Sequence, residues 1–301
     1  MIERARWSED ALHRWIHGLP APRALRGSRG HDAAVLASIR GSPVLCVDQT
    51  IEGIHFEPGT APALVGRKAV GRALSDLAAT AASPRAVLVA LAAPRRCPER
   101  WIRGVLAAAR ATARAHGADL VGGDLSSTRG PAIVSVTAFG EMAARRSPPG
   151  RDRARPGQVV VLTGPVGGSR LGRHLRVRPR ILFGQRLLAA GATAMMDISD
   201  GLAWDLHRLA RASRVRIDLD LDAVPVHADA RRAARIDRRG ALDHALHDGE
   251  DHELVATLAR SRISAFRTIG RVSRGTGLWI HGTDVVTRRW KPSEGGWKHG
   301  A

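Results

Sequence analysis

The sequence of 301 residues is poor in several residue types, and each shortage excludes a class of protein. Its two cysteines, Cys46 and Cys97, are too few for a disulfide framework, and neither has the spacing of a structural zinc site. No segment approaches the ~20 consecutive apolar residues of a membrane-spanning helix. The first residues carry charges where a signal peptide needs an apolar run. We therefore expect a soluble, cytoplasmic protein with no membrane partner.

Aromatic residues make up only 4% of the chain and tyrosine is absent, so stacking platforms for single-stranded nucleic acid are scarce. The formal net charge is +19, but only three of the 47 basic residues are lysines. The arginines are spread through every segment and form no single basic stripe. This distribution argues against specific nucleic-acid binding and favours a surface that attracts small anions.

The sequence does contain apolar runs typical of strands, which alternate with amphipathic stretches typical of helices. This alternation occurs on both sides of residues 145–158, where proline, glycine and arginine crowd together as in a linker. A length of 301 residues with 44% hydrophobic content is enough to bury two cores. We therefore predict two α/β domains, residues 1–145 and residues 146–301.

Aspartates recur at the ends of predicted strands or beside glycine. Six positions share this placement: Asp32, Asp48, Asp76, Asp124, Asp197 and Asp200. Each of them alone is compatible with a turn former or a helix N-cap, and Asp200 could simply cap the helix that begins at Gly201. Six carboxylates in one cleft would repel one another unless cations lay among them, and oxygen-rich clusters suit Mg²⁺ shared with substrate phosphates. The pattern indicates phosphoryl transfer assisted by a divalent metal.

None of the standard phosphate-binding loops accompanies these aspartates. The sequence has no GxxxxGK[ST] motif and no kinase-type glycine loop followed by a VAIK lysine. The segment TGPVGGSRLG, residues 163–172, could offer backbone amides to a phosphate, but a glycine turn of this kind is more often a structural bend. Metal ions must therefore carry most of the phosphate charge.

Several blocks of the sequence, taken in order, resemble the thiamine-monophosphate kinases, a family within the superfamily named for aminoimidazole ribonucleotide synthetase. The blocks are GHDAAVL, VDQTIEGIHF, SDLAATAASPRAVLVALAAP, GADLVGGD, RARPGQVVVLTGPVGGS, MMDISDGLAWDL, LDLDAVP, GEDHEL and IGRV. The resemblance covers almost the full length. Each block alone is weak, but SDLAA, VGGD, DISDGL and GED in this order are specific.

The resemblance implies an α/β (α+β) protein with the two-domain aminoimidazole ribonucleotide synthetase-like fold. In such a fold the N-terminal domain holds ATP and metals and joins that of a second protomer, so that a homodimer shares a barrel-like sheet. The C-terminal α/β domain closes over the site. The implied activity is ATP-dependent phosphorylation of thiamine monophosphate to thiamine diphosphate, with Mg²⁺ as cofactor.

Roles carry over by position in the matching blocks. The six aspartates named above match metal-binding carboxylates, with Asp48 and Asp200 at the catalytic centre. The family residues that contact ATP correspond here to Gly123, Asp124, Arg151 and Ser199. The family residues that contact thiamine monophosphate correspond to His55, Glu250 and Trp297. An aromatic platform and a carboxylate suit a flat, cationic ring.

The residues alone leave alternatives open for three of these positions. His55 could equally be a core histidine, Trp297 could belong to a disordered tail, and Arg151 lies in a linker where arginine is plentiful.

The sequence also departs from the family pattern. His31 stands where the family has a second aspartate, Cys46 and Val47 stand where it has hydroxyl residues, and His252 replaces a tyrosine. Because the missing hydroxyls would supply oxygen ligands, one metal ion could be held less tightly. Two other hypotheses therefore remain: a diverged family member that uses ATP on another small substrate, and an inactive scaffold that binds nucleotide.

Overall fold

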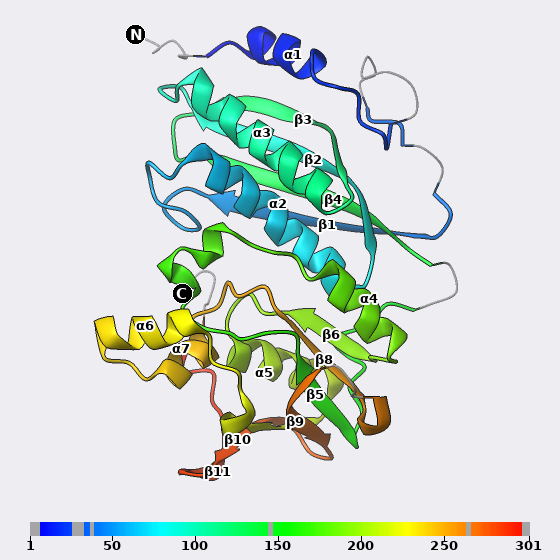
Figure 1. Cartoon of the computed structure of the whole chain (residues 1–301), viewed down its shortest axis with the longest axis vertical. Coiled ribbons are helices and arrows are strands. Elements are labelled where there is room, and N and C mark those ends of the chain that lie inside the picture. Colours follow the sequence, from blue (N-terminus) through cyan, green and yellow to red (C-terminus); the bar gives the residue numbers. More distant parts are fainter. Residues whose placement is uncertain (1–6, 26–32, 37–38, 144–146, 263–265, 297–301) are drawn as a thin grey trace. The chain divides into compact units, whose positions relative to one another are not determined.

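The computed structural model describes residues 7–25, 33–36, 39–143, 147–262 and 266–296 (Figure 1). The chain divides into two compact units. The first comprises Met1–Leu77, Ala82–Arg146 and Leu175–Val177, and the second comprises Ala78–Ala81, Ser147–His174 and Arg178–Ala301. Each unit has a sheet of its own, so the protein is a two-domain mixed α/β fold.

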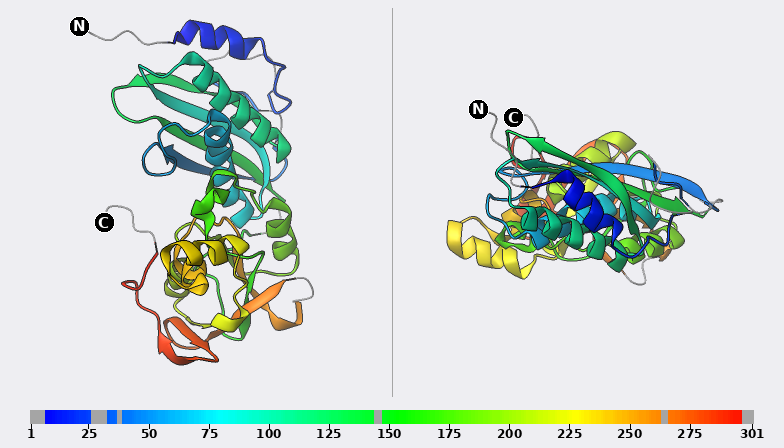
Figure 2. Two further views of the ribbon diagram at one scale, coloured as in Figure 1. Left: turned by 60° about the vertical axis from the view of Figure 1, so that its left-hand side comes forward. Right: turned by 90° about the horizontal axis from the view of Figure 1, so that it is seen from above.

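The first unit is built on a four-stranded sheet in the order β1-β4-β2-β3, in which only β2 and β3 are parallel. Its helices and strands, in chain order, are α1 (Glu9–His17), β1 (Ser42–Ile51), α2 (Pro62–Ala79), β2 (Ser83–Pro94), α3 (Glu99–Ala115), β3 (Asp119–Thr128) and β4 (Ile133–Met142). Helices α2 and α3 lie on one side of the sheet (Figure 2). Every second residue of β4 is buried, as expected for a strand with one covered face.

Helices α2 and α3 approach each other closely because a glycine lies between them. A Cβ atom at Gly66 would lie 2.2 Å from the carbonyl oxygen of Val105 in α3. Any side chain at Gly66 would therefore force the two helices apart. Gly66 thus has a packing role, which explains why the alanine-rich α2 carries glycine here despite its low helix propensity.

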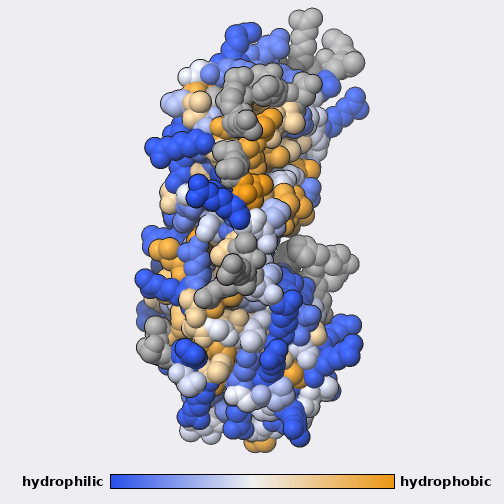
Figure 3. Space-filling model, turned by 90° about the vertical axis from the view of Figure 1, so that its right-hand side faces the viewer, coloured by the Kyte–Doolittle hydropathy of each residue, from blue (hydrophilic) through white to orange (hydrophobic). Residues whose placement is uncertain are grey.

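The other face of the first sheet exposes apolar side chains. Leu45 and Val47 of β1 are 66% and 64% exposed, and Leu88 of β2 is 40% exposed. Apolar side chains also gather on one side of this unit in the space-filling view (Figure 3). Contiguous apolar surface of this kind is typical of an interaction site.

The second unit has a seven-stranded sheet in the order β11-β10-β7-β9-β5-β8-β6, in which only β10 and β7 pair in parallel. Its main elements are β5 (Gln158–Leu162), α4 (Ile181–Ala189), β6 (Ala194–Asp197), α5 (Leu202–Ser213), β7 (Arg216–Asp220), α6 (Ala228–Asp237), α7 (Ala241–His247), β8 (Leu254–Ala259), β9 (Arg267–Ser273), β10 (Gly277–Gly282) and β11 (Val285–Arg289). The described residues also form short 3₁₀ turns at Ser169–Leu171, Arg173–Leu175, Leu221–Ala223 and Arg260–Arg262.

The core of the second unit lies between its sheet and α5. Leu202, Leu206 and Leu209 are fully buried on one side of α5 and belong to the same apolar cluster as strand residues of the sheet and Trp290. Their spacing of three and four residues is the period of a helix that packs on one face. This packing fixes the start of α5, where the acidic segment of the candidate site lies. Among the helices that the structure describes, none has the length and apolar character needed to cross a bilayer.

Candidate active site

The acidic segment of the second unit is a tight connection between β6 and α5. Asp197 ends β6, and α5 begins two residues after Asp200, with Gly201 as its N-cap. Gly201 has a φ of +114°, and a Cβ atom there would lie 2.9 Å from the carbonyl oxygen of Leu246. Asp197 and Asp200 are only 4% and 7% exposed. The segment therefore holds two buried carboxylates within one turn.

A third carboxylate, Asp205 of α5, folds back onto this turn. Its Oδ2 atom accepts the backbone N–H groups of Ser199 and Asp200, each at 3.0 Å. Burial, reinforced by the nearby charge of Asp200, raises the pKa of Asp205 to about 8. Our sequence interpretation assigned no role to Asp205. The structure makes it the residue that fixes the backbone under two predicted site residues.

Arg208, one turn further along α5, supplies positive charge to the same carboxylates. Its Nη1 atom donates to Asp200 Oδ2 and lies 3.5 Å from Asp205 Oδ1. The guanidinium group also lies 5.4 Å from the ring centroid of Trp204. Because the burial of two like charges is costly, this arginine offsets their repulsion. Arg208 was not predicted from the sequence, where it is one of many arginines.

The GEDHEL segment lies along the acidic turn and brings Glu250 to it. The N–H of Glu250 donates to the carbonyl of Ser199 at 2.7 Å, and the N–H of His252 donates to that of Ile198 at 2.9 Å. Both Glu250 and His252 have left-handed φ values, +51° and +52°. The structure thus brings the predicted substrate residue Glu250 beside the predicted ATP residue Ser199.

The imidazole of His252 contacts the carboxylate of Asp197. Its Nδ1 atom lies 3.2 Å from Asp197 Oδ2, and both side chains are almost fully buried. Its Nε2 atom is buried and has no hydrogen-bond partner among the residues that the structure describes. This histidine, which replaces the tyrosine of the family pattern, therefore lies against a predicted metal ligand.

The glycine loop after β5 is a structural bend at its two central glycines. The N–H of Gly167 donates to Asp251 Oδ1 at 2.8 Å, and the N–H of Gly168 donates to Asp248 Oδ2 at 2.9 Å. These amides are therefore already satisfied by the chain's own carboxylates. These contacts support the structural bend that the sequence favoured for TGPVGGSRLG over a phosphate-binding loop.

Asp251 gives a pH-dependent prediction. Burial raises its pKa from 3.8 to about 6, although Arg173 donates to its Oδ1 atom at 2.8 Å. The folded state therefore binds this proton more tightly than the unfolded state. The resulting stability is complete below about pH 4 and is lost as pH rises through about 6. Urea denaturation gives the unfolding free energies of wild type and Asp251→Asn. We expect the value for wild type minus the value for the variant to fall as the pH rises from about 4 to above 6. A difference that rises instead would contradict the raised pKa.

In the first unit, α2 holds positive charge against two predicted site residues, Asp48 of β1 and His55 of the loop that follows β1. Arg72 of α2 donates from Nη2 to Asp48 Oδ1 at 3.4 Å and from Nη1 to the carbonyl of Gln49 at 2.9 Å. Lys68, a fully buried lysine, donates to the carbonyl of His55 at 2.5 Å. Asp76 lies one turn beyond Arg72 on the same helix. Neither cation was predicted from the sequence.

The ring of His55 forms a hydrogen bond with the backbone at the end of β1. Its Nδ1 atom accepts the N–H of Ile51 at 3.0 Å. The residue as a whole is half-buried. The contact of His55 with thiamine monophosphate stays a prediction.

Gly123 and Asp124 lie in β3, across the sheet from Asp48. The strand register places Asp48, Val136, Val89 and Gly123 in one row. Asp48 is on the face that α2 covers, because Arg72 reaches it. Asp124 is exposed and lies opposite Ala90, which is exposed on the open face. Within the described ranges, no three His, Cys, Asp or Glu side chains form a group that could hold a metal ion unaided.

Gly123 has no room for a side chain. A Cβ atom there would lie 1.9 Å from the carbonyl oxygen of Val89 on the neighbouring strand. We expect Gly123→Ala to lower the unfolding free energy by about 2 kcal/mol, because the backbone of β2 or β3 must shift. Gly130→Ala is the control, since its Cβ would meet no atom closer than 3.6 Å. Equal denaturation midpoints for the two variants would contradict the close approach.

Three predicted residues need separate mention. Asp32 and Trp297 lie outside the described residues. The residue before Trp297 is informative, since a Cβ atom at Gly296 would lie 2.8 Å from Trp204 Cβ and 3.2 Å from the carbonyl of Asp200. The chain therefore reaches the acidic turn at Gly296. Arg151 is exposed, and its carbonyl accepts a hydrogen bond from Ser213 Oγ at 2.8 Å.

Two models of known protein families match the sequence of this chain. The model for the AIR synthase related protein N-terminal domain matches residues 30–142, and the model for its C-terminal domain matches residues 155–281. The chain belongs to the AIR synthase-related family. The acidic turn, the GEDHEL segment and the glycine loop all lie within the C-terminal match, whereas Asp48, Asp76 and Asp124 lie within the N-terminal match.

Relatives within the AIR synthase-related family include thiamine-monophosphate kinases. The one from Corynebacterium glutamicum is 35% identical over 269 residues, which cover 81% of this chain and 81% of that protein. The one from Mycobacterium tuberculosis is 34% identical over 282 residues, which cover 88% of this chain and 84% of that protein.

Solved structures agree with this placement. AaThiL complexed with AMPPCP and TMP has a TM-score of 0.79 and 27% identity, over 96% of this chain and 95% of its own. Thiamine monophosphate kinase from Aquifex aeolicus has a TM-score of 0.75 and 28% identity, over 83% of this chain and 89% of its own. The hydrogenase maturation protein HypE in complex with ATP, at 21% identity and a TM-score of 0.73 over 87% of this chain and 88% of its own, shares the fold.

Proposed function

We propose that this protein phosphorylates thiamine monophosphate to thiamine diphosphate with ATP, in the cytoplasm. The observation that carries the proposal is the acidic turn of the second unit, where hydrogen bonds of the backbone hold Ser199 beside Glu250 and fix Asp200, two residues after Asp197 ends β6. The match to thiamine-monophosphate kinases over most of the chain, and the solved complex of AaThiL with AMPPCP and TMP, support it.

The residues present fit Mg²⁺. This ion keeps several waters and is usually bound by one or two carboxylates together with substrate phosphates, so a cage of three side chains is not needed. Asp197 and Asp200 supply two buried carboxylates in one turn. We propose that these two carboxylates hold Mg²⁺, and that Asp32, Asp48, Asp76 and Asp124 are further metal-binding carboxylates of the first unit. When bound, Mg²⁺ would neutralise charge on the phosphates of ATP.

The chain's own residues would then bind and orient two anions. Gly123, Asp124, Ser199 and Arg151 would contact ATP. His55, Glu250 and Trp297 would contact thiamine monophosphate. Because a phosphate monoester is already ionised near neutral pH, its oxygen can attack the γ-phosphorus without a general base. One P–O bond forms to that oxygen, the bond to the β,γ-bridging oxygen breaks, and ADP leaves with the electron pair.

One assay tests the proposal against its alternatives. Purified protein is mixed with ATP, Mg²⁺ and thiamine monophosphate, and ADP and thiamine diphosphate are both measured. The proposal requires the two products in equal amounts. ADP without thiamine diphosphate would indicate another small acceptor, and the absence of both would indicate an inactive scaffold.

We also propose that the protein is a homodimer joined through the open face of the first sheet, as a barrel-like assembly would require. The exposed Leu45, Val47 and Leu88 supply apolar surface for such an interface.

The dimer can be tested at one exposed position. We expect Leu45→Glu to shift the protein to monomer in light scattering coupled to gel filtration, because a charge would be buried in the interface. Leu182→Glu in α4 of the second unit is the control, since Leu182 is 67% exposed, as Leu45 is at 66%. A wild-type monomer, or a Leu45→Glu dimer, would contradict the interface.

A further inference from the structure

The carboxylate of Asp200 is already paired with a cation of the chain itself. The Nη1 atom of Arg208 donates to Asp200 Oδ2, and among the residues that the structure describes no other group donates to this carboxylate. Asp200 is also one of the two carboxylates proposed above to hold Mg²⁺. A metal ion on this carboxylate would meet the guanidinium group at close range, where two positive charges repel. Arg208 and a metal ion must therefore compete for Asp200.

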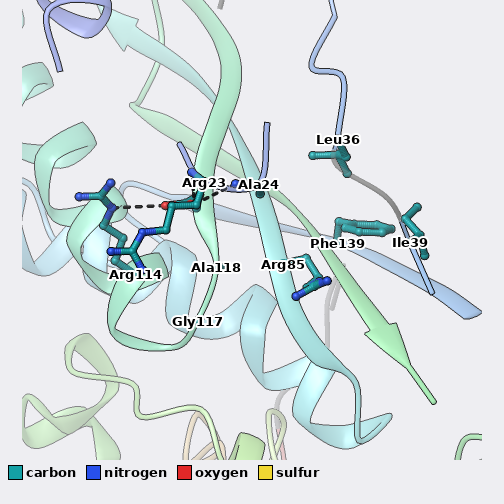
Figure 4. Close-up of a pocket in the computed structure, with 10 residues that line it drawn as sticks. Arg23, Ala24, Leu36, Ile39, Arg85, Arg114, Gly117, Ala118 and Phe139 are labelled. Carbon is teal, nitrogen blue, oxygen red and sulfur yellow. Dashed lines mark hydrogen bonds and ion pairs between the residues drawn. The ribbon is translucent and has the colours of Figure 1, made fainter. Parts of the chain in front are cut away.

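A second arginine–aspartate pair shows what distinguishes this one. Arg114 donates from Nε to Asp119 Oδ1 at 3.3 Å, beside the cavity of the first unit (Figure 4). Side-chain exposure is 39% and 12% in this pair and 38% and 10% in that of Arg208 and Asp200. Oδ2 of Asp119 also accepts two backbone N–H groups, at 2.7 and 3.2 Å. Asp119 is thus fixed by several donors, whereas the pair at Asp200 opens with the loss of one donor.

Arg208 has contacts that keep it near the acidic turn when it leaves Asp200. Its guanidinium group lies 5.4 Å from the ring centroid of Trp204, one turn earlier on α5. This cation–π contact holds the group at the start of the helix. Its Nη2 and Nε atoms donate to no acceptor among the described residues. These two nitrogens form the planar fork that binds a phosphate side by side, so the group has donors ready for an anion.

We propose that Arg208 is an exchangeable counterion of the acidic turn. Without metal it neutralises Asp200, and when Mg²⁺ takes that carboxylate the guanidinium group turns to the phosphates of ATP through Nη2 and Nε. The inference rests on the proposed function, which assigns Mg²⁺ to Asp200 and ATP to Ser199. It gives Arg208 two effects of opposite sign, because the side chain weakens the binding of metal alone and strengthens the binding of nucleotide with metal. Removal of a purely structural arginine would weaken both.

The first measurement is the affinity of the full-length protein for Mn²⁺ alone, followed through the EPR signal of the free ion. Mn²⁺ takes the same oxygen ligands as Mg²⁺. We expect Arg208→Gln to bind Mn²⁺ at least about tenfold more tightly than wild type, the scale of one hydrogen bond to a charged group. Arg208→Lys keeps the positive charge, so its affinity should stay within about threefold of wild type. The control is Arg211→Gln, which removes an exposed arginine of α5 and should bind as wild type does.

The second measurement is the affinity for AMPPCP, a non-hydrolysable analogue of ATP, by calorimetry with Mg²⁺ in excess. We expect Arg208→Gln to bind AMPPCP at least about tenfold more weakly than wild type, since one charged contact to phosphate is lost. Arg211→Gln should again match wild type. The opposite signs of the two shifts in Arg208→Gln are the signature of an exchangeable counterion.

Three results would overturn this role. The first is a Mn²⁺ affinity in Arg208→Gln that equals or falls below that of wild type. The second is an equal gain in Arg211→Gln, which would be an effect of net charge alone. The third is unchanged binding of AMPPCP in Arg208→Gln. The formation of thiamine diphosphate by wild type is measured separately: product without the Mn²⁺ shift refutes the counterion and keeps the proposed function, whereas both shifts without product keep the counterion and refute the kinase activity.

Discussion

Asp200→Asn should abolish the formation of thiamine diphosphate while the protein stays folded. Asp200 is a buried carboxylate whose charge is opposed by Arg208, and it is proposed to hold Mg²⁺ against the phosphates of ATP. Asparagine keeps the shape of the side chain and its backbone N–H bond to Asp205, but it removes the negative charge that a hard cation needs. We expect kcat to fall at least about 100-fold, the scale of losing one electrostatic contact in the transition state.

The control for Asp200→Asn is Asp152→Asn, a charge change at an exposed residue of the same unit. Circular dichroism and the urea midpoint should be close to wild type for both variants. The Mg²⁺ concentration for half-maximal rate should rise in any residual activity of Asp200→Asn and stay constant in Asp152→Asn. Full turnover in Asp200→Asn would remove Asp200 from the metal site.

The outline of the fold could be predicted because strand and helix periodicities are local properties of the sequence. The segment AMMDISDGLAWDL predicted a strand, a turn and a helix, and the structure has β6, the turn and α5 there. The order of strands in each sheet could not be predicted, since it depends on which non-local segments pair. The second sheet is mostly antiparallel, although alternating strands and helices favour parallel pairing.

The candidate site was predictable only where a residue type itself carries the chemistry. Asp197 stood out as a carboxylate at a predicted strand end, Asp200 as one beside glycine, and Glu250 through the family motif. Arg72 and Arg208 could not be predicted, because arginine occurs throughout this chain. Nothing in the local sequence distinguishes these two arginines, which contact site carboxylates, from the others. These ion pairs become visible only when strand and helix are placed together.

Contacts also decided between alternatives that the sequence left open. Backbone amides in a glycine turn can meet either a phosphate or a carboxylate of the same chain, and sequence does not say which. The carboxylates that engage Gly167 and Gly168 come from Asp251 and Asp248, about 80 residues later in the chain. Such long-range partners are invisible to a motif.

Asp205→Ala should cost both stability and activity, whereas Asp205→Asn should retain much of each. The alanine variant leaves the N–H groups of Ser199 and Asp200 without their acceptor, and each buried unsatisfied group costs about 1–3 kcal/mol. We therefore expect a loss of about 2 kcal/mol or more in urea denaturation. Asparagine keeps one acceptor oxygen, and because the pKa of Asp205 is raised to about 8, the substitution changes little charge at neutral pH.

Kinetic measurements on Asp205→Ala distinguish a positioning role for Asp205 from a purely structural role. If Asp205 fixes the Ser199–Asp200 backbone for ATP and metal, Asp205→Ala should lower kcat about 100-fold, since a displacement of about 1 Å has that effect. The KM for thiamine monophosphate should change less, because Glu250 is held to Ser199 by its own backbone bond. An Asp205→Ala protein that is less stable yet turns over at the wild-type rate would show that Asp205 supports the fold alone.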